Sequence, residues 1–312
     1  MRPGDYTLAE YLRMKLTHFD SNVRELPGIS NPLYRDCLIE QMIDSVKRIK
    51  YVWTISNRNI SEICTDTLNA AFDPLKAAIC FKNKGKIDEA FWMAFLATHF
   101  GKHNGTGWGL VRGIYGGLDS TVWTWEKICQ ETSEFREWLD ANNSQLKDMG
   151  AFSNHRKYQS LGAYNPTGTG STIASYIDWI GPQHDHISTF NNICEGLDSR
   201  TPKNIFKALY NSMNAVVGFG RMGRFDYLTM IGKLGLYDVE PDSAYLAGAT
   251  GPVPGTKLLF FGNRNQQVRT GILDAYLNEL NDHLDVYFGM QVLEDAICNW
   301  QKNPGNYRHF RG

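Results

Sequence analysis

The chain has 312 residues, with 32 basic and 33 acidic side chains and a formal net charge of -1. Its 42% hydrophobic and 21% charged residues give the balance of a globular protein, which excludes a disordered chain and a coiled coil. The near-zero net charge excludes a uniformly basic nucleic-acid binder, although a local basic face remains compatible with it.

No apolar run reaches the roughly 18 residues that a membrane span needs, and the segment 1–5 lacks the apolar stretch of a secretory signal. The six cysteines are far apart in sequence and form no CxxC pair, so neither a zinc site nor an iron–sulfur cluster is expected. We therefore expect a cytoplasmic protein with buried free thiols, no metal, no cofactor, no membrane association and no obligate protein partner.

Helical periodicity dominates the first third of the chain. Thr7 is expected to cap a first helix. A turn-rich segment over 26–32 separates that helix from a second one over 33–55. The stretch 87–100 is apolar nearly all round, which predicts a helix in the middle of a core that ends at Gly101.

The later segments are also mainly helical. The segment 142–172 is polar, glycine-rich and poorly periodic, after which Ser171 or Thr172 is expected to cap a helix to Ile180. Only 257–261 has the pattern of a strand. Further helices are expected near 105–114, 123–139 (two short helices), 187–195, 203–213, 221–235, 266–283 and 288–302. The pattern predicts an all-α fold, with residues 1–312 forming one compact unit of two lobes around a cleft.

The most informative motif is a G-x-G-x-x-G at Gly218, Gly220 and Gly223, with an acid, Asp242, 22 residues after Gly220. One interpretation is a Rossmann dinucleotide turn with the acid on the ribose. That turn requires a buried strand before the glycines, and only 215–217 is continuously apolar there. A Rossmann sheet also requires further βα units, whereas most of the remaining chain is helical in pattern.

A second interpretation is a helix–hairpin–helix over about 203–235. Two glycines permit a tight hairpin between helices, and its backbone N–H groups then face a DNA phosphate at the start of the second helix. In DNA glycosylases with this motif, a catalytic Asp follows the hairpin at almost the interval seen for Asp242. The third interpretation is a plain glycine-rich turn, with Asp242 on the surface capping a helix from Ser243.

Met222 decides the kind of chemistry that the second interpretation predicts. Bifunctional glycosylases of this superfamily carry a Schiff-base Lys two residues after the second hairpin glycine, where this chain has a thioether. No lyase step is then expected, and the reaction is hydrolysis. Asp242 would stabilise the oxocarbenium-like charge on the sugar and orient or deprotonate the attacking water.

Three blocks of sequence extend the resemblance. They are DEAFWMAFLATHFGKH at 88–103, NHRKY at 154–158, and the stretch 218–252 with RFDYLTMIGKLGL and YLAGATGP. Over roughly residues 30–262 the chain resembles the alpha-glutamyl/putrescinyl thymine pyrophosphorylase clade 3 family. That family is similar to the helix–hairpin–helix glycosylases and includes members associated with anti-phage defence.

The resemblance implies a monofunctional glycosylase that acts on double-stranded phage DNA. It would flip out a bulky modified base such as alpha-glucosyl-hydroxymethylcytosine, cut the N-glycosidic bond and leave an abasic site. Two alternatives remain open. One is a DNA-base-modifying transferase or pyrophosphorylase acting on activated hydroxymethyluracil in DNA, and the other is a non-catalytic helix–hairpin–helix DNA-binding module.

The candidate site residues come from these motifs and blocks. Basic side chains in NHRKY suit phosphates and its tyrosine suits stacking on a base, although a solvated basic loop has the same pattern. His99 and His103 are four apart, but no HExxH motif accompanies them. His184 and His186 are expected to be surface turn residues. DNA contacts are assigned to Gly218, Gly220, Arg221, Arg224, His155, Arg156, Lys157 and Lys102. A base pocket is assigned to Tyr158, Trp92, Asp88, His103 and Tyr245.

Overall fold

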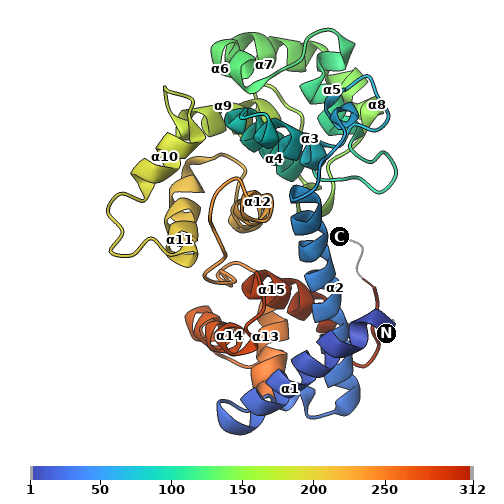
Figure 1. Ribbon diagram of the computed structural model, residues 1–312, viewed down its shortest axis with the longest axis vertical. Helices are drawn as coiled ribbons and strands as arrows, with labels where there is room; N and C mark the ends of the chain where they lie inside the picture. Colours follow the sequence, from blue (N-terminus) through green and yellow to red (C-terminus); the bar gives the residue numbers. More distant parts are fainter. Residues whose placement is uncertain (1–2, 310–312) are drawn as a thin grey trace. The chain divides into compact units, whose positions relative to one another are not determined.

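The computed structural model describes residues 3–309, and within this range every regular element is a helix (Figure 1). The all-α prediction is therefore confirmed. The chain forms two compact units. Unit 1 comprises Met1–Tyr51 and Pro241–Gly312, and unit 2 comprises Val52–Glu240. None of the helices in the described range is long and apolar enough to cross a membrane.

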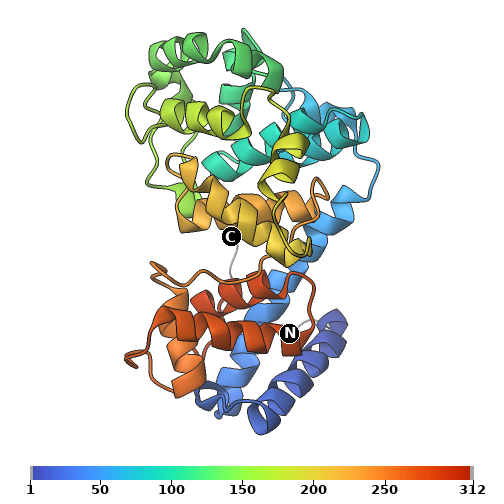
Figure 2. The same cartoon turned by 90° about the vertical axis from the view of Figure 1, so that its left-hand side faces the viewer.

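Unit 1 is a bundle of helices around one apolar core (Figure 2). Its elements are α1 (Tyr6–Asn22), the first part of α2 (Pro32–Ser56), α13 (Pro252–Phe261), α14 (Thr270–Leu284) and α15 (Gly289–Trp300). Leu12, Leu16 and Phe19 are fully buried and recur three or four residues apart, so they form one stripe of α1. Leu277 and Leu280 of α14 belong to the same core.

Unit 2 is built around α4 (Ile87–Phe100), whose residues from 90 to 100 are all buried. Phe95 lies at its centre, with its ring stacked 3.8 Å from that of Tyr176 and 5.0 Å from that of Phe219. The other helices are α3 (Pro74–Asn83), α5 (Gly109–Tyr115), α6 (Trp125–Gln130), α7 (Thr132–Ala141), α8 (Asn143–Met149), α9 (Thr169–Ile180), α10 (His186–Ile193), α11 (Pro202–Ser212) and α12 (Arg221–Lys233).

The strongest periodic patterns are reproduced closely. The predicted helix over 87–100 is α4, residue for residue, and Gly101 ends it with a φ of +69°. The helix predicted over 33–55 is α2 with one residue added at each end. These helices carry continuous apolar periodicity, so local sequence is sufficient to define them.

The strand predicted over 257–261 is wrong, because these residues are the second half of α13. Pro252 occupies the first position of α13, where its missing N–H is not needed, and Gly262 ends the helix in the left-handed conformation. Leu259 and Phe260 are buried in unit 1. A short apolar run fits a buried helix as well as a strand, and only the packing distinguishes them.

Other corrections concern the ends of helices. Thr7 lies inside the first turn of α1 and does not cap it, since Asp5 is the N-cap residue. α9 begins at Thr169, before the expected cap, and α8 lies within the segment expected to be irregular. The sequence prediction also omitted α3, whose N-cap Asp73 accepts hydrogen bonds from the N–H groups of the first turn.

Candidate functional site

The glycine motif joins two helices that pack against each other, α11 and α12 (Figure 1). After α11 the chain makes a short 3₁₀ turn, Met213–Ala215, and then passes through Gly218 at a φ of +73°. α12 starts at Arg221, with Gly220 as its N-cap residue. Because the residues before the glycines are helical, the Rossmann interpretation is wrong. We call residues 213–220 the hairpin.

Arg156 holds the hairpin from the protein interior. Its side chain is buried, and its Nη1 donates to the carbonyl oxygen of Gly218 at 2.8 Å. Its Nε donates to the carbonyl oxygen of His99, 3.3 Å away, and its guanidinium lies 4.5 Å from the ring centre of Phe219. The structure thus places Arg156 behind the hairpin as a positioning residue, and not on the surface where the sequence analysis expected it to grip a phosphate.

The hydrogen bonds of Arg156 beneath the hairpin extend to the side chain of His99. Burial lowers the pKa of the His99 imidazole well below its usual value, and the positive charge of Arg156 adds to this shift. The neutral ring can accept a hydrogen bond from Arg156 at Nδ1, at 3.1 Å, while its Nε2 lies 3.1 Å from Thr169 Oγ1. Burial lowers the pKa of Arg156 to about 10, so its guanidinium remains charged at neutral pH. A positive charge is therefore fixed directly beneath the hairpin.

The three glycines of the motif serve different purposes. Gly218 has the left-handed φ that glycine adopts without strain. A Cβ on Gly223 would lie 2.7 Å from Arg156 Nη1, so packing requires glycine there. Gly220 has an ordinary φ of -68°, and a Cβ built on it would meet nothing within 4 Å. The fold gives no reason for glycine at position 220, whereas a ligand that approaches the backbone closely would.

Several other predicted DNA contacts lie near this hairpin. The N–H of Ser153 donates to the carbonyl oxygen of Phe100, which brings the loop after residue 152 against the end of α4. In this loop, His155 Nδ1 lies 3.0 Å from a carboxylate oxygen of Asp226 on α12. Lys157 and Tyr158 are exposed, with the lysine Nζ 5.0 Å from the centre of the tyrosine ring.

The turn after α4 is held by its own contacts. Lys102 is exposed, with its Nζ 5.7 Å from the centre of the Trp108 ring. Nδ1 of His103 accepts from the N–H groups of Gly105 and Thr106, so this nitrogen holds a tight turn. The other predicted role of His103, in a base pocket, stays a prediction.

Three further predicted site residues have partners within unit 2. Arg224 donates from Nη1 to the carbonyl oxygen of Tyr210 at 3.1 Å and lies over the tyrosine ring, so it joins α12 to α11. The indole of Trp92 is fully buried and donates to the carbonyl oxygen of Trp123, which places it in the core and away from a base. One guanidinium nitrogen of Arg221 contacts the Met222 sulfur.

The expectation that His186 is a surface turn residue is wrong. Its side chain is fully buried, with Nδ1 2.7 Å from Asp88 Oδ1 and Nε2 2.7 Å from the hydroxyl of Tyr176. That hydroxyl is in turn 2.7 Å from the hydroxyl of Tyr227 on α12. Asp88 therefore anchors a polar chain through the core of unit 2, and its proposed contact with a base has no support from this geometry.

The charge states of Asp88 and His186 in this hydrogen-bonded series follow from burial and from the bonds between them. Burial lowers the pKa of His186 despite the raising effect of Asp88. For Asp88, burial raises the pKa, but the hydrogen bonds from His186 outweigh it and leave the value below the usual range. A neutral imidazole between a carboxylate and a phenol satisfies all of these groups without burying an unpaired charge.

In unit 1, Asp242 lies in an ordered loop. The hydroxyl of Tyr245 donates to Asp242 Oδ1 at 2.6 Å. The side chain of Asp274 on α14 accepts from the N–H of Leu246 and from the hydroxyl of Ser243, each at 3.1 Å. No helix starts at Ser243, so the interpretation of Asp242 as a helix cap is wrong.

The backbone of this loop is strained at Tyr245, which has a φ of +51°. A bulky side chain rarely adopts this conformation, and it persists only where the surrounding structure enforces it. Here Ala244 and Leu246, on either side, are fully buried. The loop therefore holds the tyrosine hydroxyl on the carboxylate of Asp242 in one defined geometry.

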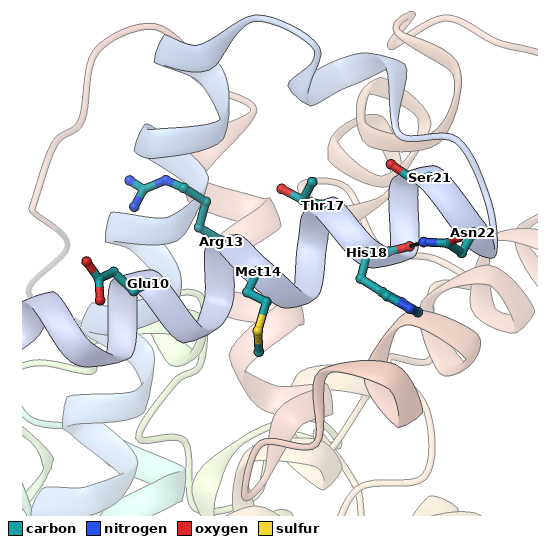
Figure 3. A pocket seen from close by; sticks show the side chains of 7 residues that line it. All are labelled: Glu10, Arg13, Met14, Thr17, His18, Ser21 and Asn22. Atoms are coloured by element: carbon teal, nitrogen blue, oxygen red, sulfur yellow. Dashed lines mark hydrogen bonds between the residues drawn. The ribbon is translucent and has the colours of Figure 1, made fainter.

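A hollow along α1 contains none of the predicted site residues. It is lined by one helix only (Figure 3), and Met14 and His18 are exposed on it. Arg13 on the same helix pairs with Asp36 at 2.7 Å. Across the described residues, no group of three His, Cys, Asp or Glu side chains is arranged to hold a metal ion.

These features define an all-helical protein with a glycine hairpin between two helices and an acid held in an ordered loop. The family model for alpha-glutamyl/putrescinyl thymine pyrophosphorylase clade 3 matches residues 33–312, and the chain belongs to this family. No curated protein and no solved structure matches the chain. Membership in this family indicates an enzyme that acts on modified bases in DNA.

Proposed function

We propose that the protein is a monofunctional DNA glycosylase that removes a bulky modified base and leaves an abasic site. The observation that carries the proposal is the hairpin between α11 and α12, followed 22 residues after Gly220 by Asp242 in a rigid loop. This order of helix, Gly-x-Gly, helix and acid is the one that helix–hairpin–helix glycosylases use.

The geometry of the hairpin supports binding of a DNA phosphate. The first N–H groups of α12 have no side-chain cap, and they lie at the positive end of the helix dipole. Gly220 leaves open space beside them. The fixed charge of Arg156 beneath the hairpin favours an anion further, and Lys157 and Lys102 supply exposed cations in the same unit.

Asp242 is the proposed catalytic residue. As the N-glycosidic bond breaks, its bonding electrons leave with the base, and positive charge develops on the sugar. A carboxylate close to that charge stabilises the transition state. Water then adds to C1′ and loses its proton, which Asp242 accepts or directs. The hydrogen bond from Tyr245 limits rotation of the carboxyl group, so that this carboxylate is positioned before the substrate arrives.

Met222 supports hydrolysis without strand cleavage. It lies two residues after the second hairpin glycine, at the position where a lyase would need an amine. The thioether cannot form a Schiff base with C1′. The proposed product is therefore an intact strand with an abasic site.

The proposed substrate is a base that carries a large substituent, such as alpha-glucosyl-hydroxymethylcytosine in phage DNA, and the proposed role is defence against phage. The test is to incubate the protein with glucosylated and with unmodified phage DNA and then treat both with hot alkali. Strand breaks confined to the modified DNA are expected. Breaks that appear before alkali would point to a lyase, and an absence of breaks in both would exclude glycosylase activity on these substrates.

A second candidate function comes from the family description, which names a pyrophosphorylase. Such an enzyme would displace diphosphate from activated hydroxymethyluracil in DNA and keep the base attached. It requires cations around the leaving diphosphate more than it requires a catalytic carboxylate. Release of diphosphate from such DNA, with no free base, would favour this function over the glycosylase.

A further inference from the structure

A groove of about 620 Å³ lies in unit 2 beside the loop that follows α8, and of its lining only Lys157 has a role in the function proposed above. Its apolar lining comes from Leu110, Phe152 and Leu161, of which the two leucines are almost fully buried. A volume of this size is within the range of small-molecule sites and exceeds what one side chain would fill. The groove is therefore large enough for a nucleobase.

The polar lining of the groove has a single sign of charge. Lys147 on α8 and Lys157 in the loop contribute to it and are both exposed, and no acidic residue lines it. Since the whole chain has a net charge of -1, this local excess of positive charge selects an anionic ligand. Among the amides that line the groove, Asn143 donates to the carbonyl oxygen of Leu161 and Asn165 accepts from the N–H of Thr167. The amide of Gln159 adds hydrogen-bonding groups that suit the edge of a base.

One residue of the groove, Gln159, also lies against the hairpin. Gln159 lines the groove, and its side-chain oxygen lies 3.0 Å from where a Cβ on Gly218 would be. Tyr158, next to Lys157, has a side chain that is 86% exposed, which suits stacking on a base. A DNA strand with a phosphate bound at the hairpin would therefore pass close to the groove.

We propose that this groove binds an unpaired nucleotide of single-stranded DNA. The base lies against Phe152 and Leu161, and the phosphate lies between Lys147 and Lys157. Apolar contact with the base and cationic contact with the phosphate are how proteins bind single strands without reading their sequence. The inference rests on the proposed function only in taking DNA as the ligand, and it does not involve Asp242.

The test measures binding of a fluorescent twelve-nucleotide oligothymidylate to the full-length protein by anisotropy, as a function of salt. Lys147→Ala is expected to weaken binding about threefold to tenfold and to lower the slope of log affinity against log salt by about 0.7, the loss of one phosphate contact. Ser160→Trp, which places a large ring in the groove, is expected to weaken binding at least about fivefold, since one stacked base is lost.

Lys86→Ala is the matched control. Lys86 is exposed and precedes α4, whereas Phe152 packs against Phe100 at the other end of that 14-residue helix, about 20 Å away. This variant should bind as the unmodified protein does. Equal binding by Lys147→Ala, Ser160→Trp and the unmodified protein would overturn the inference. The two proposals fail independently. If the groove variants bind normally but base release still requires Asp242, only the groove inference fails. If base release is absent but the groove variants bind weakly, only the glycosylase proposal fails.

Discussion

The hairpin of unit 2 and the Asp242 loop of unit 1 are both irregular segments that contact a buried or half-buried ionic side chain, but the two side chains have opposite charge and bond opposite kinds of group. Arg156 donates to the carbonyl oxygens of Gly218 and His99. Asp274 accepts from the N–H of Leu246 and the hydroxyl of Ser243.

This difference determines what each segment can offer to a ligand. In the hairpin, Arg156 holds the carbonyl oxygen of Gly218 and Ser175 Oγ accepts from the N–H of Val217, whereas the N–H groups at the start of α12 carry no side-chain cap, which suits an anion. In the loop the anchored groups are donors, and the segment carries a carboxylate, which suits a developing cation. The two units therefore have separate roles in the proposed reaction, binding in unit 2 and chemistry in unit 1, and the variants below test that division.

Asp242→Asn is expected to have the largest effect. Removing the charge while keeping the shape should slow base release about 100- to 1000-fold, because a preorganised electrostatic group is lost. Affinity for duplex DNA should stay within about twofold of the unmodified protein, which anisotropy would measure alongside single-turnover base release. Unchanged release would remove Asp242 from the mechanism, and loss of both activities would mean that the chemistry and the binding are not divided between the units.

Gly220→Asp tests the binding role of the hairpin with effects of opposite sign. Asp is a favoured N-cap residue and its charge complements the helix dipole, so stability should rise by about 0.5–1 kcal/mol. The same charge repels a phosphate, so affinity for duplex DNA should fall tenfold or more. Gly220→Asn, which caps equally well without the charge, is the control. A stabilised protein whose DNA affinity is unchanged would show that the hairpin does not contact phosphate.

The stability of unit 2 should depend on pH through two fully buried histidines. His99 and His186 both have pKa values below the usual 6.5, because burial disfavours their charged forms. The unfolded chain binds these protons below about pH 6.5 while the folded chain does not. The stabilising effect of the neutral imidazoles is therefore fully present above that pH. It falls as the pH decreases towards the folded-state pKa of each histidine, by at most about 1.4 kcal/mol per pH unit for each.

Thermal unfolding between pH 7 and pH 5 would measure this dependence. The variant His186→Gln should show a shallower decline than the unmodified protein, since one of the two protons no longer contributes. His283 on α14 of unit 1 also has a pKa below its usual value, mainly because burial disfavours its charged form, so the decline is not confined to unit 2. A midpoint that does not change over this range would contradict the neutral state assigned to both imidazoles.

Tyr245→Phe should have the smallest effect. It removes the hydroxyl that orients Asp242 but keeps the ring, and a hydrogen bond of this kind contributes about 1 kcal/mol. Base release should slow about fivefold with KM unchanged, because positioning of the carboxylate is affected and substrate binding is not. A larger increase in KM than decrease in kcat would instead place Tyr245 in direct contact with the base.

The regular elements were predictable from sequence wherever the signal is local. α4 carries eleven consecutive buried residues and a terminal glycine, so its bounds could be predicted from the chain alone. The helices on both sides of the hairpin have clear periodicity, and this was sufficient to favour a helix–hairpin–helix over a Rossmann turn. The prediction of a strand over 257–261 was wrong because a short apolar run has no periodicity that distinguishes a strand from a buried helix.

The roles of polar residues were harder to predict because they depend on distant partners. His186 is buried by contacts with Asp88, which is 98 residues away in the chain, although its sequence neighbours are those of a surface turn. Arg156 was expected on the surface because it follows His155 and precedes Lys157, yet its partner Gly218 is 62 residues away. A basic motif shows where charge accumulates in the sequence and does not show which of its side chains point inward.

The most direct test of the central claim is mass spectrometry of the small molecules released when the protein is incubated with glucosylated phage DNA. The glycosylase account predicts the free modified base in the supernatant, with an equal number of abasic sites in the DNA, and no release by Asp242→Asn. Release of diphosphate without free base, or free base in equal amounts from both proteins, would contradict it.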